Sequence, residues 1–159
     1  MPSNLSSSAR KVSDALKSHG LICEVLELPQ TTRTADDAAR AVGCGVGQIV
    51  KSLVFQGKHT RLPFLVAVSG INRVDEQKLA RLVSEPVIKA DAGFVRENTG
   101  FAIGGVPPVG HARCMRIFID EDLFQYGEIW AAAGNPRAVF KLTPAELLKI
   151  NGGQVAAVK

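Results

Sequence analysis

Apolar residues repeat at helical spacing in the first part of the chain and at strand spacing in much of the rest. Leu5, Ala9, Val12 and Leu16 lie three or four positions apart, which predicts a helix that ends near Gly20. Short apolar runs bounded by turn residues predict strands in the remainder. These runs are residues 21–28, 51–55, 63–68, 115–119, 129–133 and 138–142, with a brief strand at 87–88 and an edge strand at 154–158.

Polar residues that commonly cap helices precede several helical segments. Thr34, Asp75, Asp91 and Asp120 each stand directly before such a segment, and we interpret them as N-caps. Residues 143–146 (TPAE) form a capping box with proline at the first helical position, which predicts the start of a last helix.

Two turns join strands that are close in sequence. Residues 56–58 (QGK) and 134–136 (GNP) have strong turn chemistry and predict two β-hairpins. Hairpins with interspersed helices favour an α+β fold over a regular βαβ array. We therefore expect one domain over residues 1–159, with a mixed, mostly antiparallel β-sheet and flanking helices.

The composition is that of an ordinary globular protein: 46% of the 159 residues are hydrophobic and 21% are charged. The longest unbroken apolar run, residues 64–68, is far too short to cross a bilayer. The N-terminal residues lack the basic start and apolar segment of a signal peptide. We therefore expect a cytoplasmic protein with no membrane partner.

The cysteines and histidines indicate no metal site. Cys23, Cys44 and Cys114 are widely and irregularly spaced, and none of the three histidines has metal-ligand spacing to another. In a reducing compartment we expect all three cysteines to be buried small hydrophobic residues. The net charge of +4 permits contact with a phosphate backbone without demanding it. Because dinucleotide and P-loop patterns are also absent, we expect no cofactor and no metal.

Residues 99–113 (TGFAIGGVPPVGHAR) combine flexible and rigid backbone positions. Gly104 and Gly105 allow another molecule to approach the main chain, whereas Pro107 and Pro108 stiffen the loop and remove two amide donors. A rigid loop with free amides beside a strand is suited to hold a small polar ligand. The alternative is a connection that only turns a corner.

Two side chains near these segments could take part in chemistry. Lys51 starts an apolar strand, where an inward-pointing lysine must find an anion or lower its pKa, unless it extends to solvent. His111 follows the rigid loop and could donate a hydrogen bond or relay a proton, or it could be a polar residue at a strand end. No Gly-x-Ser-x-Gly pattern indicates a nucleophilic serine.

Four motifs in this order resemble the YbaK and prolyl-tRNA synthetase-associated editing-domain family. They are residues 47–55 (GQIVKSLVF), 67–75 (AVSGINRVD), 99–110 (TGFAIGGVPPVG) and 133–137 (AGNPR). The resemblance implies a mixed α+β fold and hydrolysis of the ester that joins a wrong amino acid to tRNA. It also implies that mischarged tRNA is the partner, with prolyl-tRNA synthetase as a second one.

The resemblance extends to single residues. Lys51 matches a lysine thought to engage the tRNA terminus, and residues 104–108 match a Gly-x-x-x-Pro substrate loop. We assign candidate catalytic roles to Lys51, Gly104, Gly105, Pro108 and His111. We assign candidate substrate-binding roles to Thr34, Ser52, Ser69, Gly110, Gly134 and Asn135.

One departure from the family bears on specificity. The cysteine-specific members carry a tyrosine and an aspartate where this chain has Leu28 and Val139. The deacylases for alanine or similarly small residues are therefore more similar, and the leading hypothesis is trans-acting hydrolysis of alanine or another small amino acid from tRNA(Pro). The alternatives are a Cys-tRNA(Pro) deacylase, a non-catalytic module that binds tRNA or a synthetase, and a hydrolase of small acyl esters.

Overall fold

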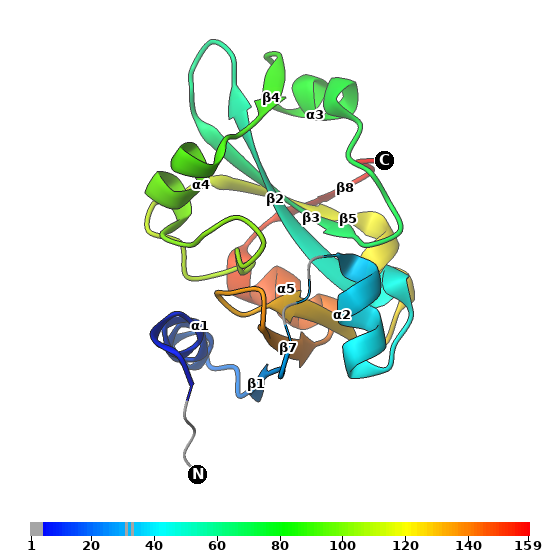
Figure 1. Cartoon of the computed structure of the whole chain (residues 1–159). Helices are drawn as coiled ribbons and strands as arrows, with labels where there is room; N and C mark the ends of the chain where they lie inside the picture. Colours follow the sequence, from blue (N-terminus) through cyan, green and yellow to red (C-terminus); the bar gives the residue numbers. More distant parts are fainter. Residues whose placement is uncertain (1–4, 31, 33) are drawn as a thin grey trace.

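The computed structural model describes residues 5–30, 32 and 34–159, so the first four residues of the expected N-terminal region lie outside it (Figure 1). The helices are α1 (Ser7–Ser18), α2 (Ala35–Val42), α3 (Glu76–Val83), α4 (Ala92–Thr99) and α5 (Pro144–Asn151), with 3₁₀ turns η1 (Val46–Gln48) and η2 (Glu121–Gln125). Among the described residues, no helix is both long and apolar enough to cross a membrane.

The strands form one mixed sheet. They are β1 (Val25–Glu27), β2 (Ile49–Gly57), β3 (Pro63–Ser69), β4 (Val87–Lys89), β5 (Arg116–Asp120), β6 (Ile129–Ala132), β7 (Ala138–Leu142) and β8 (Gln154–Ala156). Their order is β1-β7-β6-β2-β3-β5-β8, with β4 also paired to β2. The pairs β2–β6, β3–β5 and β5–β8 are parallel and the other four are antiparallel. Both expected hairpins, the edge strand β8 and the mixed, mostly antiparallel sheet are confirmed.

Strand β2 has an interrupted edge. On one side it pairs continuously with β3 from Val50 to Gln56. On the other side β6 pairs only with Ile49 and Val50, and β4 pairs only with residues 55–57. Residues 51–54 therefore have no strand partner on that side within the described chain. This gap in the sheet is the feature on which the candidate site depends.

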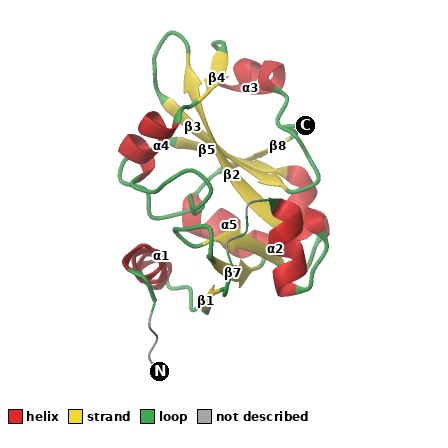
Figure 2. Ribbon diagram, viewed as in Figure 1, coloured by secondary structure: helices red, strands yellow, loops and turns green. Residues whose placement is uncertain are grey.

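Helices cover both faces of the sheet, α2 and α3 on one side and α1, α4 and α5 on the other (Figure 2). Alternate residues of β2 point to opposite faces. Val50 and Val54 belong to the core shared with α1, α4 and α5, whereas Ile49 packs with α2 and Phe55 packs with α3. The polar residues Lys51 and Ser52 therefore point to opposite sides of the strand.

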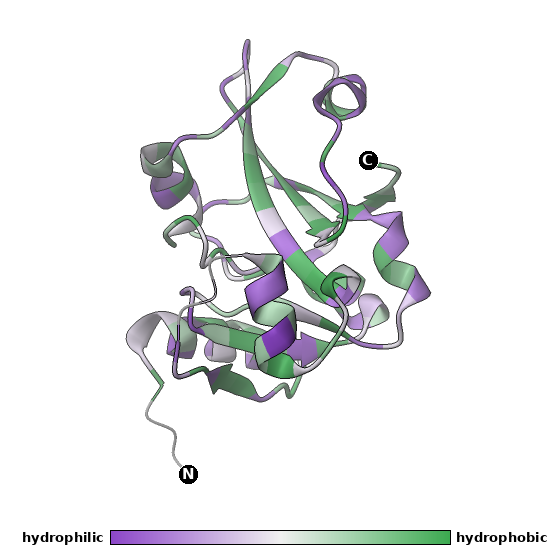
Figure 3. Ribbon diagram, turned by 45° about the vertical axis from the view of Figure 1, so that its right-hand side comes forward, coloured by the Kyte–Doolittle hydropathy of each residue, from purple (hydrophilic) through white to green (hydrophobic). Residues whose placement is uncertain are grey.

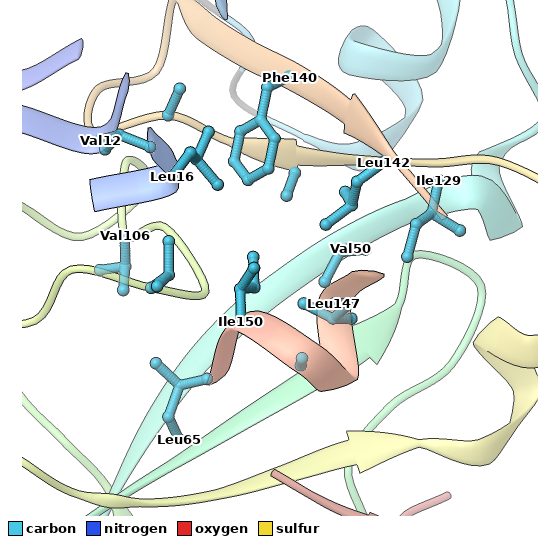
Figure 4. Packing of buried hydrophobic residues seen from close by; sticks show 14 of the residues in the cluster. Val12, Leu16, Val50, Leu65, Val106, Ile129, Phe140, Leu142, Leu147 and Ile150 are labelled. Carbon is cyan, nitrogen blue, oxygen red and sulfur yellow. The ribbon is translucent and has the colours of Figure 1, made fainter. Parts of the chain in front are cut away.

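The largest core lies where the sheet curls around α5. Figure 4 shows Leu16 of α1, Phe140 of β7 and Leu147 of α5 converging with Leu65 of β3. All four side chains are almost completely buried. Burial of such apolar area supplies most of the folding free energy, which fixes the strands that border the gap.

The first strand is shorter than its apolar sequence predicts. Residues 21–28 were expected to be a strand, but β1 covers only Val25–Glu27 and pairs with β7 alone. Leu21 is buried in the core beside α1, whereas Ile22 is 95% exposed. The pairing of β1 with β7 begins only at Val25.

The expected burial of all three cysteines is wrong for Cys114. Its thiol belongs to an exposed stretch of the loop before β5, which no helix covers, whereas Cys23 and Cys44 are partly buried. Burial raises the pKa of the Cys23 and Cys44 thiols, so neither is an activated nucleophile.

The expected N-caps are all confirmed, and Asp120 does more than cap a helix. Its Oδ1 accepts from the amide of Asp122 at 2.9 Å, as expected of an N-cap. Its Oδ2 accepts from the Ser69 amide at 3.0 Å and from Asn72 Nδ2 at 2.8 Å. Because Asp120 is only 1% exposed, this carboxylate satisfies three donors inside the protein.

We expect Asp120→Ala to lower the free energy of unfolding by about 3 kcal/mol, because buried donors would lose their acceptor. Asp91→Ala is the control: Asp91 is exposed and accepts one amide bond, from Phe94, so its loss should cost about 1 kcal/mol. Urea unfolding measures both. Equal losses would contradict the buried role of Asp120.

The loop after α4 packs against the turn between β6 and β7. A Cβ atom on Gly105 would lie 2.5 Å from Asn135 Cα and 2.9 Å from the Gly134 carbonyl carbon. The Asn135 side chain in turn donates from Nδ2 to the hydroxyls of Ser6 and Ser8 at 3.0 and 3.1 Å. Loop, turn and α1 are thus held as one unit.

We expect Gly105→Ala to destabilise the protein by about 1–3 kcal/mol, because backbone must move to admit the methyl group. Gly127→Ala is the matched control, since a Cβ there meets no atom within 4 Å. Thermal unfolding followed by circular dichroism compares the two. If both variants melt alike, the loop does not rest on the turn.

Candidate functional site

A cavity of about 580 Å³ opens at the gap in the sheet. Its walls come from α2, β2, β6, β7 and the loop after α4. Pockets for small ligands typically enclose about 300–1,000 Å³, so this cavity has a suitable size. The polar residues that line it include Thr34, Asp36, Lys51, Ser52, Lys89 and Asn135.

The remaining lining is mostly apolar. Val54 and Val139 contribute from strands, Ile103 and Val106 from the loop, and Trp130 from β6. Figure 3 shows the same contrast along β2, which is hydrophobic over most of its length and hydrophilic near its start. The cavity therefore combines an apolar wall with a small number of polar groups.

Lys51 presents a half-buried positive charge at this cavity. Its Nζ donates to the carbonyl of Asn72 at 2.9 Å. Burial lowers the pKa of Lys51, the like charges of Arg73 and Lys89 lower it further, and the carboxylate of Asp120 opposes them. The cavity lining thus holds two cations, Lys51 and Lys89, against the one carboxylate of Asp36, a balance that favours the binding of an anion there.

The turn that accepts the Lys51 hydrogen bond is held on its other side. Asn72 Nδ2 donates to Asp120 and also to Asp122 Oδ2 at 2.9 Å. Lys159 Nζ lies 2.9 Å from the same Asp122 oxygen. Hydrogen bonds from Lys159 and Asn72 lower the pKa of Asp122, so the carboxylate stays ionised and the turn stays fixed.

Ser52 offers hydrogen-bonding groups that the folded chain leaves unused. Its Oγ is buried and has no hydrogen-bond partner among the described residues. The Val54 carbonyl accepts from the Ala90 amide on the side of the gap. Because residues two apart in a strand share their direction, the backbone groups of Ser52 also point into the gap. A bound ligand could satisfy these groups.

The cavity brings together five of the residues assigned from the sequence: Thr34, Lys51, Ser52, Gly104 and Asn135. Three of these make hydrogen bonds within the protein: Thr34, Asn135 and Lys51, which uses one of its three Nζ donors on the Asn72 carbonyl. Thr34 Oγ1 caps α2 by accepting from the Asp37 amide at 3.1 Å, and Asn135 bonds to the start of α1. Lys51 and Ser52 therefore remain as the side chains with free hydrogen-bonding capacity.

The other six assigned residues do not line the cavity: Gly105, Pro108, Gly110, His111, Ser69 and Gly134. Ser69 Oγ donates to the Gly47 carbonyl at 2.7 Å. Gly110 and Gly134 have φ of 81° and 101°, and both pack on α1. Ser69, Gly110 and Gly134 therefore hold neighbouring segments together outside the cavity.

His111 forms a hydrogen bond within the loop after α4. Its Nε2 lies 2.7 Å from the Pro107 carbonyl, and burial lowers the pKa of the imidazole, which this bond partly opposes. A neutral histidine that donates here fixes the proline-rich loop. The Gly105 amide is also used, since it donates to the Ala102 carbonyl at 3.0 Å. The loop therefore offers fewer spare amides than its sequence predicts.

Sequence reasoning missed several lining residues. Lys89 enters the site because β4 pairs with β2 and sets Lys89 opposite Phe55. Asp36 and Trp130 reach it because α2 packs over the start of β2. The sequence does show Lys89 at the end of a very short strand. Its place in the site becomes clear only once β4 is known to pair with β2.

The described lining contains no histidine and no cysteine. Its groups can bind an anion, orient a polar ligand and enclose a small apolar one.

Several known proteins are similar to this chain in sequence or in fold. A crystal structure described as a candidate trans-editing enzyme for prolyl-tRNA synthetase is 55% identical, with a TM-score of 0.93 over 98% of this chain and 99% of that one. The uncharacterized protein YwhH of Bacillus subtilis (strain 168) is 29% identical over 83% of each chain. EbsC of Enterococcus faecalis (strain ATCC 700802 / V583), a candidate Cys-tRNA(Pro)/Cys-tRNA(Cys) deacylase, is 27% identical over 79% of this chain and 76% of its own.

The family model matches most of the chain. It covers residues 29–150, which include every wall of the cavity, the gap in β2 and the loop after α4. With this match and the shared fold, the chain belongs to the aminoacyl-tRNA editing domain family.

Proposed function

We propose that this protein is a trans-acting deacylase that hydrolyses the aminoacyl ester of mischarged tRNA, with tRNA(Pro) carrying alanine or another small amino acid as its substrate. The observation that carries the proposal is the cavity at the gap in β2. Its polar lining includes the cations Lys51 and Lys89 beside the one carboxylate of Asp36, and most of its wall is apolar. Membership of the editing family supports the same reaction class.

The chemistry required is modest. An aminoacyl ester is already activated towards water, so an enzyme can accelerate its hydrolysis by holding the ester and a water molecule in a reactive orientation. Lys51 would hold a phosphate near the tRNA terminus, which also compensates the charges that lower its pKa. Ser52 would bond to the ribose or the aminoacyl group through its free Oγ.

Selectivity for a small amino acid would come from the size of the apolar wall. This wall includes the side chains of Val54, Ala132, Ala138 and Val139. Each methylene distinguishes substrates by about 1–3 kcal/mol, so a correctly charged proline must be rejected by shape. Val139 replaces the aspartate of the cysteine-specific members, which supports alanine over cysteine.

A panel of alanyl-, cysteinyl- and prolyl-tRNA(Pro) tests the proposal. We expect alanyl-tRNA(Pro) to be hydrolysed fastest and prolyl-tRNA(Pro) at its spontaneous rate. Lys51→Met should lower kcat/KM by about 10–100-fold, because a charged hydrogen bond to phosphate is lost, and Lys51→Arg should retain part of the activity. Lys149→Met, on the exposed surface of α5, is the control and should change little.

The rival functions give different results in the same panel. Faster hydrolysis of cysteinyl-tRNA(Pro) would favour the activity named for EbsC. Tight tRNA binding without ester turnover would favour a non-catalytic module. Hydrolysis of none of the three substrates above its spontaneous rate would refute the proposal.

We expect Ser52→Ala to lower kcat/KM by about 5–10-fold while leaving stability unchanged, because the Ser52 hydroxyl has no partner in the folded protein. Ser69→Ala should instead lower the free energy of unfolding by about 1 kcal/mol, since its hydroxyl donates to Gly47. Steady-state kinetics and urea unfolding separate the two. A stability loss at Ser52 equal to that at Ser69 would indicate a structural hydroxyl.

A further inference from the structure

The excess of positive charge is confined to one segment of the chain. Residues 51–89 contain seven of the 19 lysines and arginines and three of the 15 acidic residues. The rest of the chain has twelve of each and is neutral overall. The whole net charge of +4 therefore belongs to the segment that forms β2, β3, α3 and β4, and the β2–β3 hairpin, β4 and α3 lie at one end of the molecule (Figure 1).

The cations of this end are exposed and unpaired. Lys58, Arg61, Arg73, Arg81 and Lys89 are all exposed, and within the described chain none of them makes an ion pair. They can therefore bind phosphate groups without breaking an ion pair inside the protein.

Two of the three acidic residues are engaged by backbone groups. Asp75 caps α3 by accepting from two amides. The Glu85 carboxylate accepts from the amides of His59 and Thr60 and from the Thr60 hydroxyl, and these bonds lower the pKa of Glu85. Glu85 thereby fixes the tip of the β2–β3 hairpin, which carries Lys58 and Arg61.

Strand β4 connects this tip with the cavity. Val87 pairs with Gly57 at the tip, and Lys89, at the other end of β4, lines the cavity together with Lys51. At about 3.3 Å per residue, the backbone from Lys51 to Lys58 spans about 23 Å. A row of cations thus leads from the cavity mouth to the far end of the hairpin.

We propose that the β2–β3 hairpin tip and β4 form a docking surface for the acceptor arm of tRNA, whose phosphates follow the cations from Lys89 to Lys58 and Arg61. This inference rests on the proposed function, which places the aminoacyl end in the cavity. The arm must leave the cavity mouth in some direction, and the end with net positive charge attracts its phosphates.

Binding of a fluorescent, uncharged acceptor-stem RNA hairpin at several salt concentrations tests the surface. We expect Lys58→Gln/Arg61→Gln to weaken binding about 3–10-fold near 0.1 M salt and to reduce the slope of log K against log salt by about 1–2. Lys17→Gln/Lys149→Gln removes the same charge from exposed residues of the neutral part and should leave the slope unchanged. Equal changes in both variants, or none in the first, would overturn the proposal.

A second measurement separates this surface from the catalytic proposal. Hydrolysis of the alanyl ester of adenosine requires the cavity but no RNA arm, and we expect the hairpin variant to match the wild type on it. If the ester is not hydrolysed while the salt slopes differ as expected, the proposed reaction fails and the RNA surface stands. If the hairpin variant keeps full RNA affinity but no longer binds purified prolyl-tRNA synthetase, the surface docks protein and the RNA proposal fails.

Discussion

The interrupted pairing of β2 is the constraint on which the site depends. The backbone N–H and C=O groups of a strand in the middle of a sheet normally form hydrogen bonds with two neighbouring strands. Here β6 and β4 each take one end of the same edge and leave residues 51–54 between them. The cavity, the free groups of Ser52 and the nearness of Lys89 to Lys51 all follow from that arrangement.

The ammonium group of Lys51 is held in position by residues that lie outside the cavity. Its carbonyl partner belongs to Asn72, and Asn72 is held by the buried carboxylate of Asp120. Asp120 in turn stands at the end of β5, two strands away from β2 in the sheet. The position of this positive charge therefore depends on two residues, Asn72 and Asp120, that do not line the cavity.

The sequence predicts what local chemistry decides and misses what distant pairing decides. Caps such as Asp75 and Thr143 and the two hairpins are recognisable because neighbours in sequence determine them. The gap in the pairing of β2 cannot be predicted from local sequence, because it depends on the pairing of Ile49 with the distant Trp130 of β6. Ser52 and Ser69 illustrate the limit: both belong to apolar strands, and only the register shows that Ser52 faces the cavity while Ser69 bonds to Gly47.

The separation of apolar and cationic lining residues onto different strands has an evolutionary consequence. Part of the apolar lining, including Trp130 on β6 and Val139 on β7, belongs to different strands from Lys51 on β2 and Lys89 on β4. Under the proposed function, single substitutions on β6 or β7 could thus change which amino acid fits without altering the two lysines. A scaffold of this kind can diverge into paralogues with new substrates without passing through an inactive ancestor.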